Sequence, residues 1–280
     1  MRKLIILALL GLTTLTYANI NIVVSILPQK IFLKAIGGDK VNISLMVNPG
    51  NSPHTYEPKP SQMKDIAKAD IYFTIGVEYE HTWLLRFTSQ NKTMKVIDLS
   101  HNIKKMAMKE NHQDDDHNED GLDPHIWTSP KNVKKIAKNI LDALINQDIE
   151  NKKYYINNYN KFLQQINKTD KKIKKILTNI KTGAKFMVFH PSWGYFARDY
   201  GLIQFAIESG GKSPKPKHIV YLINEAKEEK VHAIFTAPEF SEKIATQIAK
   251  EVGIKVIKVS PLNAKWSENL INLAKAIANK

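Results

Sequence analysis

The chain has 280 residues and no cysteine, and its 41 lysines and arginines outnumber 27 aspartates and glutamates, giving a formal net charge of +14. This length suffices for one large domain or for two lobes with cores of their own. Without cysteine, disulfide scaffolds and thiolate metal sites are excluded, so a metal site needs His, Asp or Glu. Because the lysines are scattered and arginine is scarce, we expect no nucleic-acid partner.

The segment 1–18 has the features of a secretory signal peptide. Arg2 and Lys3 precede an apolar run from Leu4 to Leu12, and a small-residue cleavage site ends at Ala18. No later apolar run approaches the roughly 20 residues that a membrane helix needs. We therefore expect a soluble chain, exported and cleaved after Ala18. Since no cysteine is available to carry a lipid, we expect it to be free in the periplasm of a Gram-negative cell.

The first half of the chain alternates short apolar runs with helical patterns, which predicts a Rossmann-like α/β lobe with a parallel sheet. The predicted strands are 20–27, 42–47, 71–76 and 95–100. The stretch 31–41 predicts a short helix that ends at Gly37-Gly38, and 60–70 predicts a helix that Ser61 is expected to cap.

A long helical region follows. Apolar residues recur with helical spacing over 132–147, and 150–180 contains neither proline nor glycine. The second stretch predicts one rigid helix of about 30 residues, which would span about 45 Å.

After residue 184 the alternation returns, which predicts a second α/β lobe. Its predicted strands are 185–190, 203–208, 231–237 and 255–260, and its predicted helices are 194–201, 218–230 and 242–253. The expected organisation is a signal peptide (1–18), a first lobe (19–130), a helical linker (131–183) and a second lobe (184–280).

Three histidines stand out by their context. His54 lies in the turn-rich stretch NSPHTYEP, His125 in DPHIW, and His190 at the end of a predicted strand in FHPSW. Each alone has a simpler interpretation: His54 as a solvated surface residue, His125 as a partner of a backbone carbonyl, and His190 as a strand cap. Ligands of open parallel sheets collect beyond the carboxyl ends of the strands, so together the three predict a metal site between the lobes. Imidazole suits zinc, copper and nickel.

The stretches NSPHTYEPKPSQM, DPHIWTSP and FHPSWGYFARDYGL resemble the motifs of zinc- and manganese-binding receptors of bacterial ABC transporters, the ZnuA/TroA-like family. The resemblance covers nearly the whole mature chain. It implies two α/β lobes joined by a long rigid helix, one metal ion in the crevice, and delivery of that ion to an inner-membrane permease by a monomeric receptor that is not an enzyme. It also implies that His54, His125 and His190 are ligands. Histidine at position 190, where manganese receptors tend to have a carboxylate, favours Zn²⁺ over Mn²⁺.

The chain departs from that family at two places. Ser260 stands where many members have a ligating aspartate, and Glu239 stands two positions away from the glutamate of the Glu-Pro-Gln-Phe motif. The fourth ligand is therefore open between water, Glu239 and a residue of the acidic loop 109–124.

That loop contains His112, His117 and seven carboxylates. Tracts of this composition bind metal weakly and reversibly; the alternative is a solvated insertion without a role. Two other classes of function also stay open. One is a secreted zinc hydrolase with three histidines, although the chain lacks a His-Glu-x-x-His helix. The other is an adhesin that needs no metal.

Overall fold

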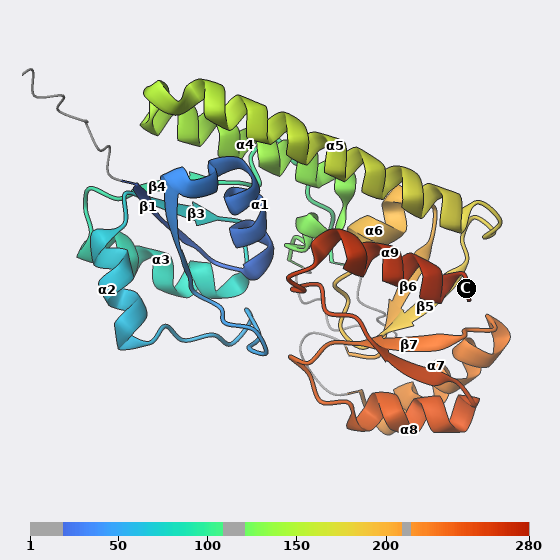
Figure 1. The fold of residues 1–280 in the computed structure, drawn as a ribbon. Coiled ribbons are helices and arrows are strands. Elements are labelled where there is room, and N and C mark those ends of the chain that lie inside the picture. The colour runs from blue at the N-terminus through green and yellow to red at the C-terminus, as the bar shows by residue number, and fades with distance from the viewer. Residues whose placement is uncertain (1–18, 109–120, 209–213, 280) are drawn as a thin grey trace, which may run out of the picture.

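The computed structural model describes residues 19–108, 121–208 and 214–279. The predicted signal peptide and most of the acidic loop, including His112 and His117, lie outside the described residues. Two lobes, each with a parallel four-stranded sheet, lie side by side, and the long helix α5 (Lys152–Leu177) runs along both of them (Figure 1). The predicted α/β class is confirmed, whereas the residue boundaries given for the lobes stay a prediction.

The first sheet has the strand order β2-β1-β3-β4, with every neighbouring pair parallel. Its strands are β1 (Ile20–Val24), β2 (Val41–Leu45), β3 (Ile71–Thr74) and β4 (Lys95–Asp98). The helices of this lobe are α1 (Leu27–Gly37), α2 (Pro60–Lys68) and α3 (Glu78–Gln90). The sequence patterns predicted all four strands but did not predict α3.

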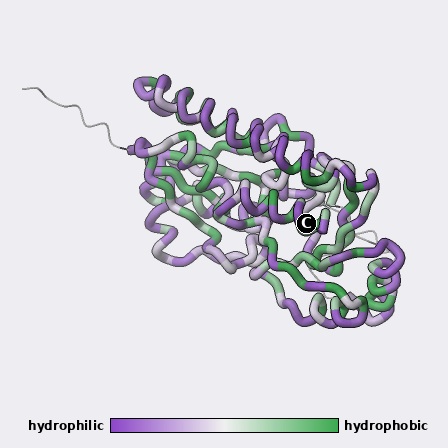
Figure 2. Tube along the Cα trace, turned by 45° about the vertical axis from the view of Figure 1, so that its right-hand side comes forward, coloured by the Kyte–Doolittle hydropathy of each residue, from purple (hydrophilic) through white to green (hydrophobic). Residues whose placement is uncertain are grey.

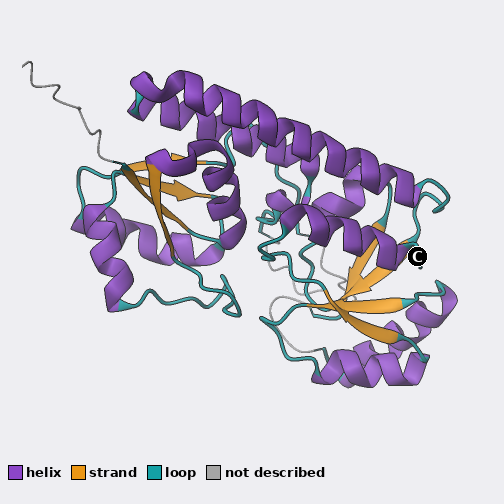
Figure 3. Cartoon of the chain, in the orientation of Figure 1, coloured by secondary structure: helices purple, strands orange, loops and turns teal. Residues whose placement is uncertain are grey.

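The second sheet repeats this arrangement in the order β6-β5-β7-β8, again with parallel neighbours. Its strands are β5 (Lys185–Val188), β6 (Ile203–Ala206), β7 (Ala233–Thr236) and β8 (Lys255–Lys258). The helices are α6 (Gly194–Asp199), α7 (Pro216–Glu228), α8 (Lys243–Val252) and α9 (Trp266–Ile277). The loops that follow the strands of both sheets meet between the lobes (Figure 3).

The predicted helical linker is formed by α4 (Pro130–Gln147) and α5 (Lys152–Leu177), which is 26 residues long and follows a 3₁₀ turn at Ile149–Asn151. Side chains such as Phe162 and Ile166 are buried on one side of α5. Hydrophilic residues recur along its whole length (Figure 2), and all of its lysines are exposed. The helix is therefore an amphipathic strut that both lobes cover on one side.

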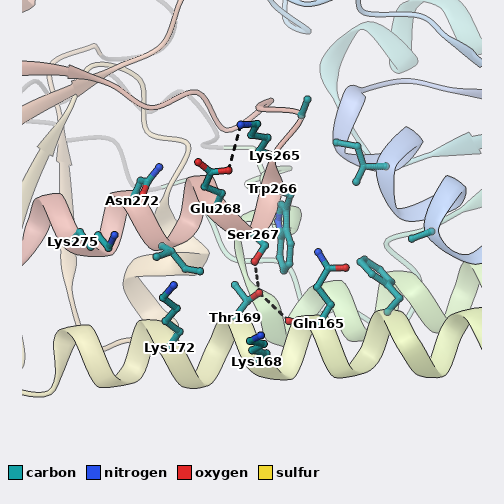
Figure 4. A pocket seen from close by; sticks show the side chains of 15 residues that line it. Gln165, Lys168, Thr169, Lys172, Lys265, Trp266, Ser267, Glu268, Asn272 and Lys275 are labelled. Atoms are coloured by element: carbon teal, nitrogen blue, oxygen red, sulfur yellow. Dashed lines mark hydrogen bonds and ion pairs between the residues drawn. The ribbon is translucent and has the colours of Figure 1, made fainter.

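Helix α9, which the sequence patterns did not predict, ties the second lobe to the first. The indole of Trp266 packs edge-on against Phe32 of α1, with ring centroids 5.5 Å apart. Thr169 of α5 and Ser267 of α9 share a hydrogen bond of 2.5 Å. A groove of about 640 Å³ lies between these two helices and is lined by lysines such as Lys168 and Lys172 (Figure 4).

One hydrophobic core extends from the first sheet through α4 and α5 to α9 and one side of the second sheet. A second, smaller core fills the other side of the second sheet under α7 and α8. Because interiors of this kind are close-packed, the continuous core restrains the lobes relative to each other. Among the described residues, no helix combines the length and the apolar character that crossing a membrane requires.

The start of α2 differs from the prediction. Ser61 does not cap this helix; the N-cap residue is Lys59, with Pro60 at the first helical position. The side chain of Gln62 accepts a hydrogen bond from the Lys59 backbone N–H at 2.9 Å. A proline pre-sets the first helical φ angle, and the amide side chain at the third position serves as the cap.

Candidate metal centre

His54 lies on the loop between β2 and α2, and Gln62 anchors that loop at its far end. The Gln62 side chain accepts hydrogen bonds from the hydroxyl of Tyr56 at 2.7 Å and from the backbone of Lys59. Its amide donates to the carbonyl of Met46, just beyond β2. Tyr56 and Gln62 are both buried. The proline-rich loop that carries His54 is thus held to the first lobe by the side chain of Gln62, whose amide oxygen and nitrogen are both hydrogen-bonded.

The ring of His54 faces two partners. Its Nδ1 lies 3.0 Å from Glu78 Oε2, in the first turn of α3, and its Nε2 lies 3.0 Å from His190 Nε2. The hydrogen bond with His54 is the main reason that the pKa of Glu78 is below its usual range. The carboxylate of Glu78 is therefore ionised at neutral pH and can only accept a hydrogen bond from the ring N–H.

His125 is held by Asp123, two residues earlier. The backbone N–H and the ring Nδ1 of His125 both lie 2.8 Å from Asp123 Oδ1. Tyr195 donates to the backbone carbonyl of Asp123 at 2.8 Å. A Cβ atom on Gly194 would lie 2.9 Å from Asp123 Oδ2, so this close approach requires glycine there. All of these contacts are buried, and they fix the orientation of the imidazole.

His190 follows β5 at the carboxyl end of the second sheet and is buried. Its Nδ1 lies 3.3 Å from Oε1 of Glu208, which follows the neighbouring strand β6. The ring stacks on Phe240 with centroids 4.7 Å apart. Burial lowers the pKa of His190 to about 4. At neutral pH the ring is therefore uncharged, which is the form that binds metal ions.

The three predicted histidines converge. Each offers a ligand atom, and these atoms all lie within 4.8 Å of one another. With Zn–N bonds of 2.0–2.1 Å, two nitrogens of a tetrahedral shell are separated by about 3.3 Å, close to the 3.0 Å between His54 Nε2 and His190 Nε2. The cavity beside the rings has a volume of about 10 Å³. Such a space accommodates an ion or a single water-sized guest.

Every one of the three rings has a carboxylate on Nδ1: Glu78 for His54, Asp123 for His125 and Glu208 for His190. A carboxylate accepts a hydrogen bond from Nδ1–H, so the free lone pair of each neutral ring is on Nε2. Carboxylate–histidine pairs of this kind orient metal-binding imidazoles and increase their basicity. The sequence analysis did not predict that these three carboxylates hold the histidine rings. Only Glu208, at the end of a predicted strand, stands at a position that could have indicated such a role.

Glu239 and Ser260 are the two positions at which the sequence differs from the family motifs, and their side chains lie next to each other. The Ser260 hydroxyl donates to Glu239 Oε1 at 2.8 Å, and Glu239 lines the same small cavity as the three histidines. Glu239 does not belong to the group of ligand atoms within 4.8 Å of one another. Burial raises its pKa, against the opposing influence of its own backbone N–H and of Ser260.

A family model described as the periplasmic component A of the zinc-uptake complex, ZnuA, matches residues 22–280. The chain belongs to this family. A crystal structure titled ZnuA superposes with a TM-score of 0.86 and 40% sequence identity, covering 93% of this chain and 98% of that one. The resemblance inferred from the histidine motifs is thus confirmed over the described lobes.

Two curated relatives of this ZnuA-family chain carry names that mention zinc. The high-affinity zinc uptake system protein ZnuA of Bacillus subtilis is 32% identical over 264 residues, covering 89% of this chain and 81% of the relative. The zinc-binding lipoprotein AdcA of Streptococcus pneumoniae is 29% identical over 260 residues, which make up 90% of this chain and 52% of AdcA. The chain therefore spans about half the length of AdcA.

Proposed function

We propose that this protein is a zinc-binding receptor that takes up Zn²⁺ outside the cytoplasm and delivers it to an ABC-type permease in the inner membrane. One observation carries the proposal: three imidazoles, each with Nδ1 held by a carboxylate, bring one ligand atom each within 4.8 Å of the others. Lone pairs that face each other at 3.0 Å repel unless a cation or a proton lies between them. Membership in the ZnuA family and the zinc-related names of the relatives support the same function.

The donor set supports zinc over manganese. We propose His54, His125 and His190 as the protein ligands, and three neutral nitrogens suit Zn²⁺, whereas Mn²⁺ prefers oxygen. The partner permease, a monomeric state and cleavage after Ala18 into the periplasm without a lipid anchor are parts of the same proposal. The acidic loop 109–124 is proposed as an auxiliary collector that binds zinc weakly through residues such as His112 and His117.

We also propose that the protein is not an enzyme. A catalytic zinc keeps an open position for water and substrate, whereas His125 and His190 are only 4% and 8% exposed and the cavity beside them measures about 10 Å³. These values favour storage of an ion over turnover of an organic substrate. An adhesin that needs no metal would have no use for three converging imidazoles.

Zinc titration of the mature chain tests the function. We expect one tightly bound zinc per chain, and His54→Ala, His125→Ala and His190→Ala should each weaken binding at least tenfold, or about 1.4 kcal/mol. His101→Ala is the matched control, because this histidine is exposed and lies in a turn after β4. A wild-type chain without a tight zinc, or a His125→Ala variant with unchanged affinity, would refute the proposal.

A further inference from the structure

One carboxylate oxygen of Glu239 accepts a hydrogen bond, and the other does not. Oε1 accepts the hydrogen bond from Ser260. Oε2 is buried and has no hydrogen-bond partner among the described residues. Native proteins seldom bury a polar atom without a partner, and an unpaired acceptor commonly marks a functional or ion-binding role. Since Glu239 lines the cavity of the three histidines, its unengaged oxygen needs an explanation at that cavity.

Ser260 is held so that its hydroxyl remains available to Glu239. The hydroxyl oxygen accepts the backbone N–H of Leu262 at 3.0 Å, and the Ser260 carbonyl accepts the side chain of Asn269 at 2.8 Å. The next carbonyl, of Pro261, accepts the indole N–H of Trp127 at 2.9 Å. With its oxygen occupied by the Leu262 N–H, the Ser260 hydroxyl directs its own proton to the carboxylate. The loop therefore presents a fixed donor rather than a metal ligand.

Resting on the proposed function, we propose that Glu239 supplies the fourth zinc ligand through Oε2, while the Ser260 hydroxyl retains Oε1 and positions the carboxylate. Three imidazole nitrogens and one carboxylate oxygen make a tetrahedral shell that Zn²⁺ accepts readily. A movement of the Glu239 side chain is required, because its oxygens stand outside the group of ligand atoms that already converge. The two differences from the family pattern then compensate each other. Ser260 replaces the ligating aspartate of many members, and it positions Glu239, which supplies the oxygen ligand instead.

The position of Glu239 supports this assignment. Glu78, Asp123 and Glu208 accept hydrogen bonds from the Nδ1 side of the rings and therefore lie behind them. Among the described residues, Glu239 is the carboxylate that lines the cavity itself. Its oxygen is thus the one placed on the same side as the Nε2 atoms, where an ion would be bound.

The experiment compares Glu239→Ala, Glu239→Gln, Ser260→Ala and Ser260→Thr with the wild type. Zn²⁺ affinity is measured by chelator competition, and Co²⁺ is used as a spectroscopic probe of the ligand shell. Glu239→Ala should weaken zinc binding at least tenfold and change the visible Co²⁺ spectrum. Ser260→Ala should weaken binding less, and Ser260→Thr, which retains the hydroxyl, should restore the wild-type spectrum. Glu242→Gln is the control, since Glu242 pairs with Lys258 away from the cavity.

Thermal unfolding of the metal-free proteins separates a ligand from a structural role. Removing a buried acceptor without a partner should leave the unfolding temperature of Glu239→Ala unchanged or higher. Wild-type zinc affinity with an unchanged Co²⁺ spectrum in Glu239→Ala would overturn the inference, as would weaker binding that merely follows a lower unfolding temperature. If His190→Ala loses zinc and Glu239→Ala does not, the receptor function stands and the fourth-ligand assignment fails.

Discussion

One carboxylate oxygen of Asp123 serves His125 twice, since Oδ1 lies 2.8 Å from both the backbone N and the ring Nδ1 of that residue. The first contact shapes the turn, and the second sets the orientation of the ring and the position of its proton. Both groups are almost fully buried. The loop that presents His125 is therefore ordered before any ion arrives, which reduces the entropy lost on binding.

Asp123→Asn tests this relationship. The asparagine retains an acceptor oxygen but loses the negative charge that makes the imidazole more basic. Substitution of such partners typically lowers metal affinity by about 10–100-fold, and we expect a decrease in this range in a zinc competition titration. Asp142→Asn, which removes an exposed partner of Lys138, should leave the affinity unchanged. Equal affinities for the two variants would contradict the role of Asp123.

Gln62 offers a second test, directed at the His54 loop. Gln62→Leu should leave the Tyr56 hydroxyl and the Met46 carbonyl without their present partner. Unpaired buried groups each cost about 1–3 kcal/mol, so we expect a lower free energy of unfolding in urea and weaker zinc binding. Gln90→Leu is the control, because Gln90 makes an exposed hydrogen bond to α2. Zinc affinity at the wild-type level would show that His54 is held without Gln62.

Glu80 gives a prediction about pH. It is buried, accepts hydrogen bonds from the backbone of Ile75 and Gly76 and from the Ser25 hydroxyl, and burial raises its pKa from 4.5 to about 7. The folded chain therefore binds this proton more tightly than the unfolded chain. The stability contributed by Glu80 is present below pH 4.5 and is lost as the pH rises through about 7.

Glu80→Gln should remove that dependence. Between pH 4.5 and 7 the free energy of unfolding of the variant should fall less than that of the wild type, by on the order of 3 kcal/mol. Urea unfolding of the metal-free proteins over this pH range is the measurement, with the exposed Glu150→Gln as control. Parallel pH profiles for wild type and Glu80→Gln would show that the carboxyl titrates normally.

The continuous core predicts small interlobe motion. Helix α5 spans both lobes, and Trp266 is held by Phe32 of the first lobe and by a hydrogen bond to the Trp127 carbonyl at 2.8 Å. Removing zinc should therefore loosen the loops of His54 and His190 locally and leave the radius of gyration in X-ray scattering nearly unchanged. Hydrogen exchange would locate the loosening. A clear expansion on zinc removal would instead indicate a hinge between the lobes.

The acidic loop can be removed without stretching the chain. Met108 donates to the carbonyl of Gly121 at 3.0 Å, and Ala107 and Leu122 form an antiparallel bridge. Residues 109–120 can therefore be replaced by Asn-Gly, which favours a two-residue hairpin turn. We expect calorimetry to show loss of weak, additional zinc equivalents and retention of the tight one. Loss of the tight site would mean that the loop supplies a ligand to it.

Local signals in the chain were sufficient for much of the fold. β-branched runs marked all eight strands of the two sheets. Apolar residues at helical spacing marked α4, and a long stretch without proline or glycine marked α5. The convergence of His54, His125 and His190 followed from the rule that parallel strands present their carboxyl ends at one edge. These features depend on periodicity and on backbone restrictions near proline, which neighbouring residues along the chain control.

The partners of those histidines were beyond such reasoning. Glu78 lies in a helix that no pattern predicted, Glu208 is 18 residues from His190, and Ser260 is 21 residues from the Glu239 that it holds. Hydrogen bonds form between groups that the packing of separate elements brings within about 3 Å. Sequence spacing does not specify that packing. The residue types that form the centre can therefore be found along the chain, but which carboxylate holds which ring depends on how the two sheets and α9 fit against the long helices.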